Sequence, residues 1–119
     1  MIHLDSRLRE RGFGKFEGWQ TEEVASFMNM TTEEGKLLES DELILDGIYD
    51  IEPWSEFSKR VWDSLEDIRA NVMGKKALVV AHGGVMRAIT LTLSHEQPVF
   101  SNGQRIMLRS DGNEWRLLQ

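Results

Sequence analysis

Apolar residues recur along this chain with two different periods, and each period predicts a different kind of element. The clearest helical pattern follows Pro53, where apolar side chains spaced by three or four residues form one stripe: Phe57, Val61, Leu65, Ile68 and Val72. Gly74 is a typical residue just past the last turn of a helix. We therefore expect one long helix that Pro53 opens and Gly74 ends.

The apolar pattern changes its period at His82. Residues 77–81 form a continuous apolar run rich in valine, which is typical of a buried strand. Two glycines follow His82, and the next apolar residues have helical spacing: Val85, Met86, Ile89 and Leu93. This order predicts a strand, a tight turn and a helix that runs to about Leu93.

Shorter elements are expected on either side of these two patterns. We expect a strand over 1–5, a glycine-broken loop over 7–19, helices starting at Thr21 and at Thr31 or Thr32, a variable loop over 39–52, and a hairpin with strands near 104–108 and 115–118. The hairpin prediction rests on the Asp111-Gly112 pair, a strong turn signal between two strand-like runs. The order of elements predicts an α/β layered fold.

Length and charge narrow the class of protein. With 119 residues, 40% hydrophobic and 29% charged, the chain is expected to be one small, globular, soluble domain over 1–119. Its formal net charge of −6 argues against a nucleic-acid partner. No apolar run approaches membrane-spanning length, and the first residues lack signal-peptide character. We therefore expect a cytoplasmic protein without a membrane partner.

The cysteine and histidine counts exclude several kinds of site. The chain has no cysteine, so a disulfide, a thiolate nucleophile and a Cys-ligated zinc are all excluded. Its 3 histidines, His3, His82 and His95, are too scattered in sequence to predict a metal site. We expect no metal and no cofactor.

His82 has the sequence context of an anion-binding residue. It ends the predicted strand, at the edge where open α/β sheets place their ligands. Gly83 and Gly84 would let the backbone approach a bound group, while the first N–H groups of the next helix point at it. Phosphate suits such a place best. The alternative is a histidine that is simply packed at a strand end.

Glu10 lies within a cluster of charged residues that has two interpretations. Its neighbours include Arg7, Arg9 and Arg11. Such a run is usually a solvated, salt-bridged surface of little energetic weight. The other interpretation is a carboxylic acid at the edge of a pocket, with a pKa that is set by its neighbours.

Two motifs resemble those of the histidine phosphatase superfamily, which includes cofactor-dependent phosphoglycerate mutases and sugar and ribazole phosphatases. Residues 8–14 read LRERGFG and 16–18 read FEG, similar to the family's L-x-E-x-x-[FY]-G…EG loop. Residues 78–87 read LVVAHGGVMR, similar to its second histidine motif. Residues 57–61 resemble the helix after the family's GES tripeptide, and Asn102-Gly103 with the closing hairpin resembles its C-terminus. The match covers nearly the whole chain in the right order.

The resemblance implies a fold and roles for individual residues. The fold would be the phosphoglycerate mutase-like layered sheet with helices, here lacking the family's N-terminal strands. His82 would be the family's second histidine and, with Gly83, would bind phosphate. Glu10 would be the acid that protonates the leaving alcohol and then activates water. The ligand would be a small phosphorylated metabolite or inorganic phosphate, and short loops favour the small phosphatases, such as alpha-ribazole phosphatase, over the mutases.

Two departures from the family pattern limit what this chain is expected to do. Residues 51–53 read Ile-Glu-Pro in place of GES and keep only the acid. The R-H-G motif, which carries the nucleophilic histidine, is absent. We therefore expect the C-terminal part of a phosphomonoesterase, inactive by itself. The alternatives are a phosphate-binding protein without turnover and a structural remnant.

The absent strands predict an association. In the family, they flank the strand that here ends at His82, so residues 77–81 would have two bare edges. Bare strand edges invite pairing with another chain. Either the run pairs with the C-terminal hairpin directly or it pairs with a second copy, and we expect the second, a homo-oligomer.

Overall fold

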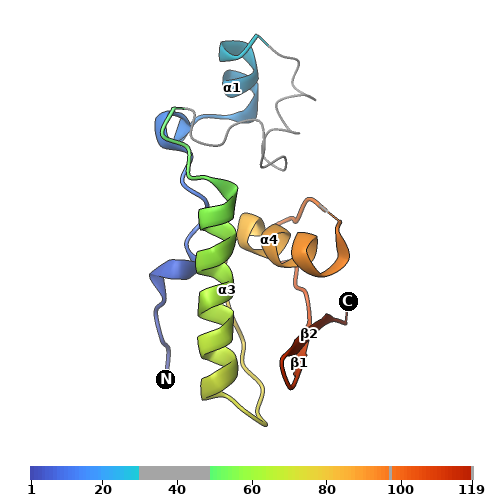
Figure 1. Cartoon of the computed structure of the whole chain (residues 1–119). Helices are drawn as coiled ribbons and strands as arrows, with labels where there is room; N and C mark the ends of the chain where they lie inside the picture. The colour runs from blue at the N-terminus through green and yellow to red at the C-terminus, as the bar shows by residue number, and fades with distance from the viewer. Residues whose placement is uncertain (30–48, 97, 119) are drawn as a thin grey trace. The chain divides into compact units, whose positions relative to one another are not determined.

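The computed structural model describes residues 1–29, 49–96 and 98–118 (Figure 1). Contacts divide the chain into two compact units, and each is considered by itself. Unit 1 consists of Met1–Glu10 and Ser58–Gln119, and unit 2 is Arg11–Phe57. Glu10 and His82 therefore both belong to unit 1.

The regular elements of the described residues are helices and one small sheet, consistent with an α/β fold. The elements are η1 (Ser6–Leu8), η2 (Gly14–Phe16), α1 (Thr21–Phe27), α3 (Trp54–Asn71), α4 (Gly83–Ser94), β1 (Leu108–Asp111) and β2 (Glu114–Leu117). The helices predicted from Thr21, after Pro53 and after His82 are confirmed, but α3 ends at Asn71 rather than just before Gly74. The predicted helix at Thr31 or Thr32 and the loop up to residue 48 lie outside the described residues.

Helices α3 and α4 supply the buried side chains of unit 1. Val61 and Leu65 of α3 and Val85, Ala88 and Ile89 of α4 are all buried, as the apolar stripes predict. Side-chain contacts link the elements: the Trp62 indole donates to the Thr92 hydroxyl, and its ring lies 6.0 Å from that of Trp115 on β2.

The C-terminal hairpin is confirmed with a shifted start. Strands β1 and β2 are antiparallel, with Leu108 opposite Leu117 and Asp111 opposite Glu114. Gly112 in the turn has a φ of 64°, a conformation that glycine adopts without steric cost. β1 begins at Leu108 rather than at residue 104, and it pairs with β2 in the only sheet within the described residues.

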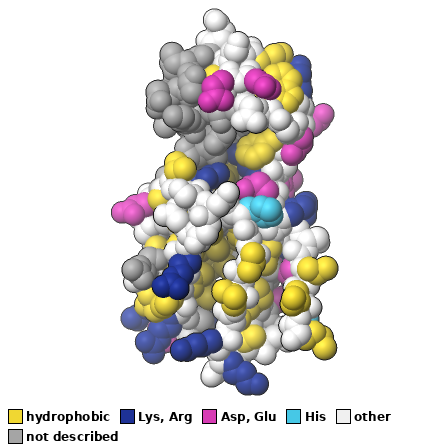
Figure 2. All heavy atoms as spheres, turned by 180° about the vertical axis from the view of Figure 1, so that it is seen from behind, with side chains coloured by type: hydrophobic (Ala, Val, Ile, Leu, Met, Phe, Trp, Pro, Cys, Tyr) yellow, Lys and Arg dark blue, Asp and Glu magenta, His cyan; other side chains and the backbone are white. Residues whose placement is uncertain are grey.

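The two predicted strands outside the hairpin do not form. Residues 1–5 and 77–81 have no strand partner, and among the described residues the backbone of 77–81 makes no hydrogen bond. Their large side chains are exposed, at 92% for Leu78, 85% for Val80 and 96% for Leu4. Figure 2 shows hydrophobic side chains at the surface of unit 1, near Lys and Arg side chains. The strand prediction was wrong here because a strand exists only beside a neighbour. The alternative, direct pairing of 77–81 with the hairpin, is also absent from the described part of the chain.

Unit 2 packs around Phe16, an aromatic residue of the glycine-broken loop. Phe16 and Ile51 are buried, with Phe13, Val24 and Met28 packed against them. The rings of Trp19, Phe27 and Tyr49 lie edge-on to Phe16 at 5.1–5.6 Å, a favoured aromatic geometry. The glycine-broken loop is thus held by its aromatic side chains.

No described helix is both long and apolar enough to cross a membrane.

Candidate functional site

His82 immediately precedes α4. Its backbone is extended, with φ −116° and ψ 162°, and its carbonyl accepts the Met86 N–H at 3.1 Å, which begins the helix. The imidazole makes no capping hydrogen bond and is exposed. It is therefore accessible to a ligand, and the interpretation of His82 as a packed strand-end histidine is wrong.

Glu10 approaches the first turn of α4 from the other end of the sequence. Its carboxylate oxygen Oε2 accepts the Gly84 N–H at 3.2 Å. A Cβ atom added at Gly84 would lie 2.0 Å from Glu10 Oε1, closer than any real contact. The sequence predicted that Gly84 lets the backbone approach a bound group. In the structure Gly84 also lets the Glu10 carboxylate come close to the backbone of α4.

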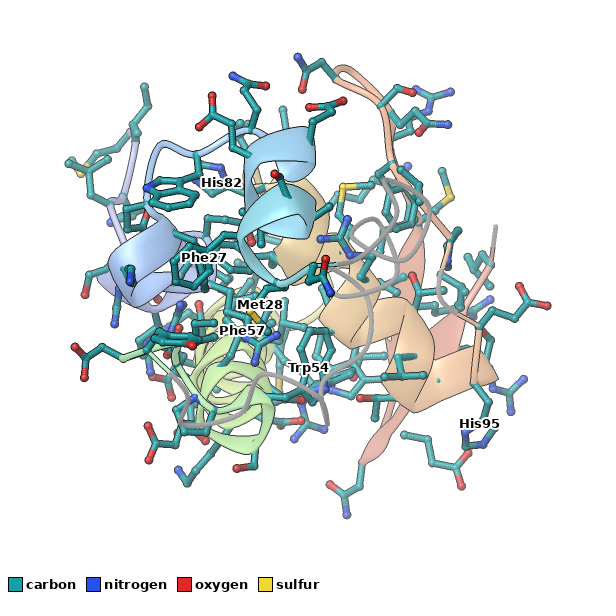
Figure 3. The ribbon with its side chains drawn as sticks, turned by 90° about the horizontal axis from the view of Figure 1, so that it is seen from above. Phe27, Met28, Trp54, Phe57, His82 and His95 are labelled. Atoms are coloured by element: carbon teal, nitrogen blue, oxygen red, sulfur yellow. The ribbon has the colours of Figure 1, made fainter. Side chains whose placement is uncertain are left out.

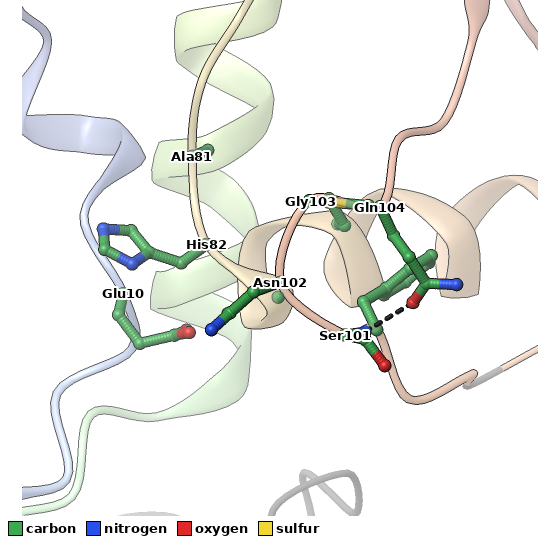
Figure 4. Close-up of a pocket in the computed structure, with 10 residues that line it drawn as sticks. Glu10, Ala81, His82, Ser101, Asn102, Gly103 and Gln104 are labelled. Atoms are coloured by element: carbon green, nitrogen blue, oxygen red, sulfur yellow. Dashed lines mark hydrogen bonds between the residues drawn. The ribbon is translucent and has the colours of Figure 1, made fainter.

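One cavity of unit 1 contains both predicted site residues (Figure 4). It has a volume of about 240 Å³ and is lined by Glu10, Ala81, His82, Gly83, Met86, Phe100, Ser101, Asn102, Gly103 and Gln104. In Figure 4 the Glu10 side chain and Asn102 point toward each other across it, with His82 beside them. The structure thus brings Glu10 together with His82 and Gly83, from which it is distant in sequence.

The polar wall at 101–104 was not predicted as part of the site. The Ser101 N–H donates to the Gln104 side chain, which tightens this turn, and Gly103 has a φ of 81°. Asn102-Gly103 could be recognised from the sequence as a turn, but nothing in a turn signal indicates which cavity it faces.

Arg87 was also not predicted as a site residue. A Cβ atom added at Gly83 would lie 3.6 Å from its Nη1 atom, so the guanidinium is near the start of α4. Its buried Nε has no hydrogen-bond partner among the described residues. The guanidinium adds positive charge close to Gly83, which favours an anion there.

The arginines beside Glu10 in sequence have separate roles in the structure. Arg7 forms ion pairs with Asp5 at 2.8 Å and with Asp67 at 2.7 Å. Its hydrogen bond to Asp5, aided by one from Ser64, holds the pKa of the Asp5 carboxyl far below its usual range. Arg9 donates to the Ser6 carbonyl. The salt-bridged surface interpretation thus holds for Arg7, while Glu10 lies at the cavity.

Glu52, the acid retained from the tripeptide position, holds the loop of unit 2. Its side chain accepts the Gly12 N–H at 3.0 Å, and its carbonyl accepts from Arg11 Nε at 2.8 Å. The Arg11 guanidinium also lies over the Trp54 ring, at 5.5 Å from the centroid, and Figure 3 shows Trp54 near Phe57. Glu52 therefore fixes loop backbone in this unit.

The other histidines do not line the cavity. His3 is exposed near the N-terminus, and His95 follows the last turn of α4, at the opposite end of that helix from His82 (Figure 3). Within the described residues, no group of three or more His, Asp or Glu side chains could hold a metal ion.

Comparisons with known proteins agree with the motifs. The model of the histidine phosphatase superfamily (branch 1) matches residues 1–119. The chain is 33% identical over 96 residues to a putative phosphoserine phosphatase 2 of Hydrogenobacter thermophilus, a match that covers 76% of this chain and 42% of that protein. The matched part of the chain thus spans less than half the length of this relative. No solved structure matches the chain.

Proposed function

Because the chain belongs to the histidine phosphatase superfamily, we propose that its cavity is the phosphate-binding and acid–base part of a phosphomonoesterase site. The observation that carries the proposal is that Glu10 and His82 line one cavity with Gly83 at the start of α4. An exposed imidazole and helix-terminal N–H groups suit the oxygens of a phosphoryl group. The ligand is a small phosphate monoester or inorganic phosphate.

The residues divide the chemistry between them. His82 and the Gly83 N–H bind the phosphoryl oxygens, where charge develops during transfer. The Glu10 carboxylic acid donates its proton to the leaving alcohol oxygen as the ester bond to phosphorus breaks. The resulting carboxylate then takes a proton from the water that attacks the phosphorylated nucleophile. Asn102 faces Glu10 across the cavity (Figure 4) and offers an amide to a polar part of the substrate.

The nucleophile is not among the 119 residues, since the sequence has no Arg-His-Gly. Loss of a nucleophile from a catalytic unit costs about 10⁶-fold in turnover. This chain by itself is therefore a binder of phosphate without measurable hydrolysis.

Titration of the chain with inorganic phosphate and with orthovanadate, followed by the imidazole resonances, tests the binding role. We expect the His82 resonances to shift with saturation, and His82→Ala to abolish the affinity. His95→Ala is the matched control, because His95 is an exposed histidine at the far end of the same helix. Equal affinity in wild type and His82→Ala would refute the proposal, and so would the absence of any binding.

Assays with an activated aryl phosphate test the absence of turnover. We expect no hydrolysis above background and no phosphohistidine on His3, His82 or His95. A phosphohistidine on any of the three would overturn the assignment of His82 to binding alone or show a different nucleophile.

We also propose that the chain is a homo-oligomer, formed when residues 77–81 of two copies pair as strands. This is supported by the unpaired backbone and the exposed Leu78 and Val80 side chains. Antiparallel pairing would place Lys75 and Lys76 of the two copies at opposite ends of the ladder, away from each other. We expect a concentration-dependent dimer in analytical ultracentrifugation, weakened by Val80→Asp. A chain that stays monomeric at all concentrations up to about 100 µM would contradict this proposal.

A further inference from the structure

Arg60 of α3 binds the backbone of the segment that carries Glu10. Its Nη1 donates to the carbonyls of Arg7 and Arg9 at 2.7 and 2.8 Å, and its Nη2 donates to the Glu10 carbonyl at 3.0 Å. All of these residues belong to unit 1. One guanidinium thus gathers three carbonyls within four residues of chain.

These carbonyls belong to a segment with little regular structure of its own. The short helix η1 ends at Leu8, and Arg9 and Glu10 lie in neither a helix nor a strand. Hydrogen bonds from a charged donor are shorter and stronger than those between neutral groups. The planar fork of arginine can satisfy several acceptors at once, which the single ammonium of lysine cannot reproduce.

Glu10 is therefore held at both ends. Arg60 binds its backbone carbonyl, and the Gly84 N–H binds its carboxylate at 3.2 Å. The first contact comes from α3 and the second from α4. In each helix the next residue along the chain is buried, Val61 after Arg60 and Val85 after Gly84. We infer that Arg60 is a positioning residue that fixes the Glu10 carboxylate at the cavity beside His82.

Other contacts attach the same segment to α3 further upstream. The Ser64 hydroxyl donates to Asp5 Oδ2 at 2.7 Å, and Arg7 Nη1 donates to Asp67 at 2.7 Å. These contacts do not include Arg60, so they keep the segment on α3 when Arg60 is replaced. Loss of Arg60 should therefore release Glu10 locally without detaching the whole segment.

The Gly84 amide reports the position of Glu10 directly. A ¹H–¹⁵N spectrum of the whole chain is recorded at one neutral pH without phosphate, where a carboxylate that accepts the Gly84 N–H displaces the Gly84 amide resonance. Glu10→Gln removes the charge of this acceptor, and the change that it causes in the Gly84 amide shift, here called the Gly84 amplitude, measures the contact. In Arg60→Met the amplitude should fall at least about threefold, because the carboxylate no longer stays on the Gly84 N–H.

A matched variant and a conservative one keep this test decisive. Lys59→Met removes the neighbouring cation of α3, whose ammonium pairs with Asp63, and should leave the Gly84 amplitude unchanged. Should Arg60→Met fail to fold, Arg60→Lys retains the charge without the fork, and its amplitude should be lowered about twofold. Full amplitude in either Arg60 variant, or an equal loss in Lys59→Met, would overturn the inference.

The catalytic meaning of this inference rests on the proposed function, but its test does not. The Gly84 amplitude is measured without an anion, so a failure there refutes the role of Arg60 alone. Failure of wild type to bind phosphate or orthovanadate would instead refute the proposed function and leave the positioning of Glu10 standing.

Discussion

Residues 77–81 and helix α4 lie on the two sides of His82, and both are rich in apolar residues. After His82, the apolar side chains of α4 are buried, with Val85 and Ala88 each 1% exposed. Before His82, Leu78 and Val80 are almost fully exposed. The same kind of composition therefore has opposite outcomes within ten residues of chain.

The difference follows from where each element finds its hydrogen-bond partners. An α-helix pairs its N–H and C=O groups within one segment, so α4 needs neighbours only for its apolar face. The N–H and C=O groups of a strand cannot pair within their own segment, so they need a neighbouring strand. α4 finds its neighbours in α3 and β2, whereas 77–81 has no strand beside it within the described residues.

The largest difference in stability is expected when a charge is placed in each of the two regions, α4 and residues 77–81. Val85→Asp buries an unpaired carboxylate and should cost about 4 kcal/mol or more in the free energy of unfolding, enough to unfold a small domain. Val80→Asp should change the stability of the monomer by no more than about 0.5 kcal/mol, because the side chain is already in water. Urea unfolding followed by far-UV circular dichroism, at a concentration below any dimerisation, measures both.

Equal losses of unfolding free energy in these two variants would contradict the difference between α4 and residues 77–81. Such a result would show that 77–81 is packed in solution, either against the chain itself or against a second copy that persists at low concentration.

A smaller effect is expected in residues 1–10, which are held by side-chain contacts because residues 1–5 form no strand. Asp5→Asn removes the ion pair with Arg7 and weakens the contact with Ser64. We expect a loss of about 1 kcal/mol at pH 7, the upper range for partly exposed ion pairs. Urea unfolding of wild type and Asp5→Asn over a pH series measures this loss.

The sign of its pH dependence follows from the lowered pKa of the Asp5 carboxyl. The stabilisation is complete above the pKa of an unfolded aspartate, about 3.9, and is lost as pH falls below it. The difference between wild type and Asp5→Asn should thus stay constant from pH 7 to about 5 and shrink in more acidic solution. A difference that grows toward low pH would contradict this account.

The smallest expected effect is a gain at the far end of α4. His95 adopts a left-handed conformation, with a φ of 60°, after the last helical turn. His95→Gly removes this steric cost but makes the unfolded chain more flexible, so we expect a net stabilisation of about 0.5 kcal/mol. The thermal midpoint of unfolding measures it, with Ser94→Gly, inside the helix, as a control that should destabilise. A lower midpoint for His95→Gly would indicate that its imidazole makes a contact of its own.

Much of the candidate site was predictable from local pattern. The glycine pair after His82, followed by helical spacing, predicted the start of α4, and motif resemblance pointed to Glu10 and His82, which line one cavity. The polar residues 101–104 and the contacts of Arg60 could not be predicted this way. Their place at the site depends on how distant segments pack, which no local period encodes.

The sequence by itself determined the long helix, the helix after His82, the hairpin turn and the family to which the chain belongs, because helical periodicity, turn residues and motifs are local signals. Tertiary structure alone decided that Glu10 accepts the Gly84 N–H and that Arg60 binds the backbone beneath it. It also decided that residues 77–81, strand-like in composition, form no strand within the described chain. The physical reason is that a helix is completed within its own segment, whereas a strand is completed only by a neighbour.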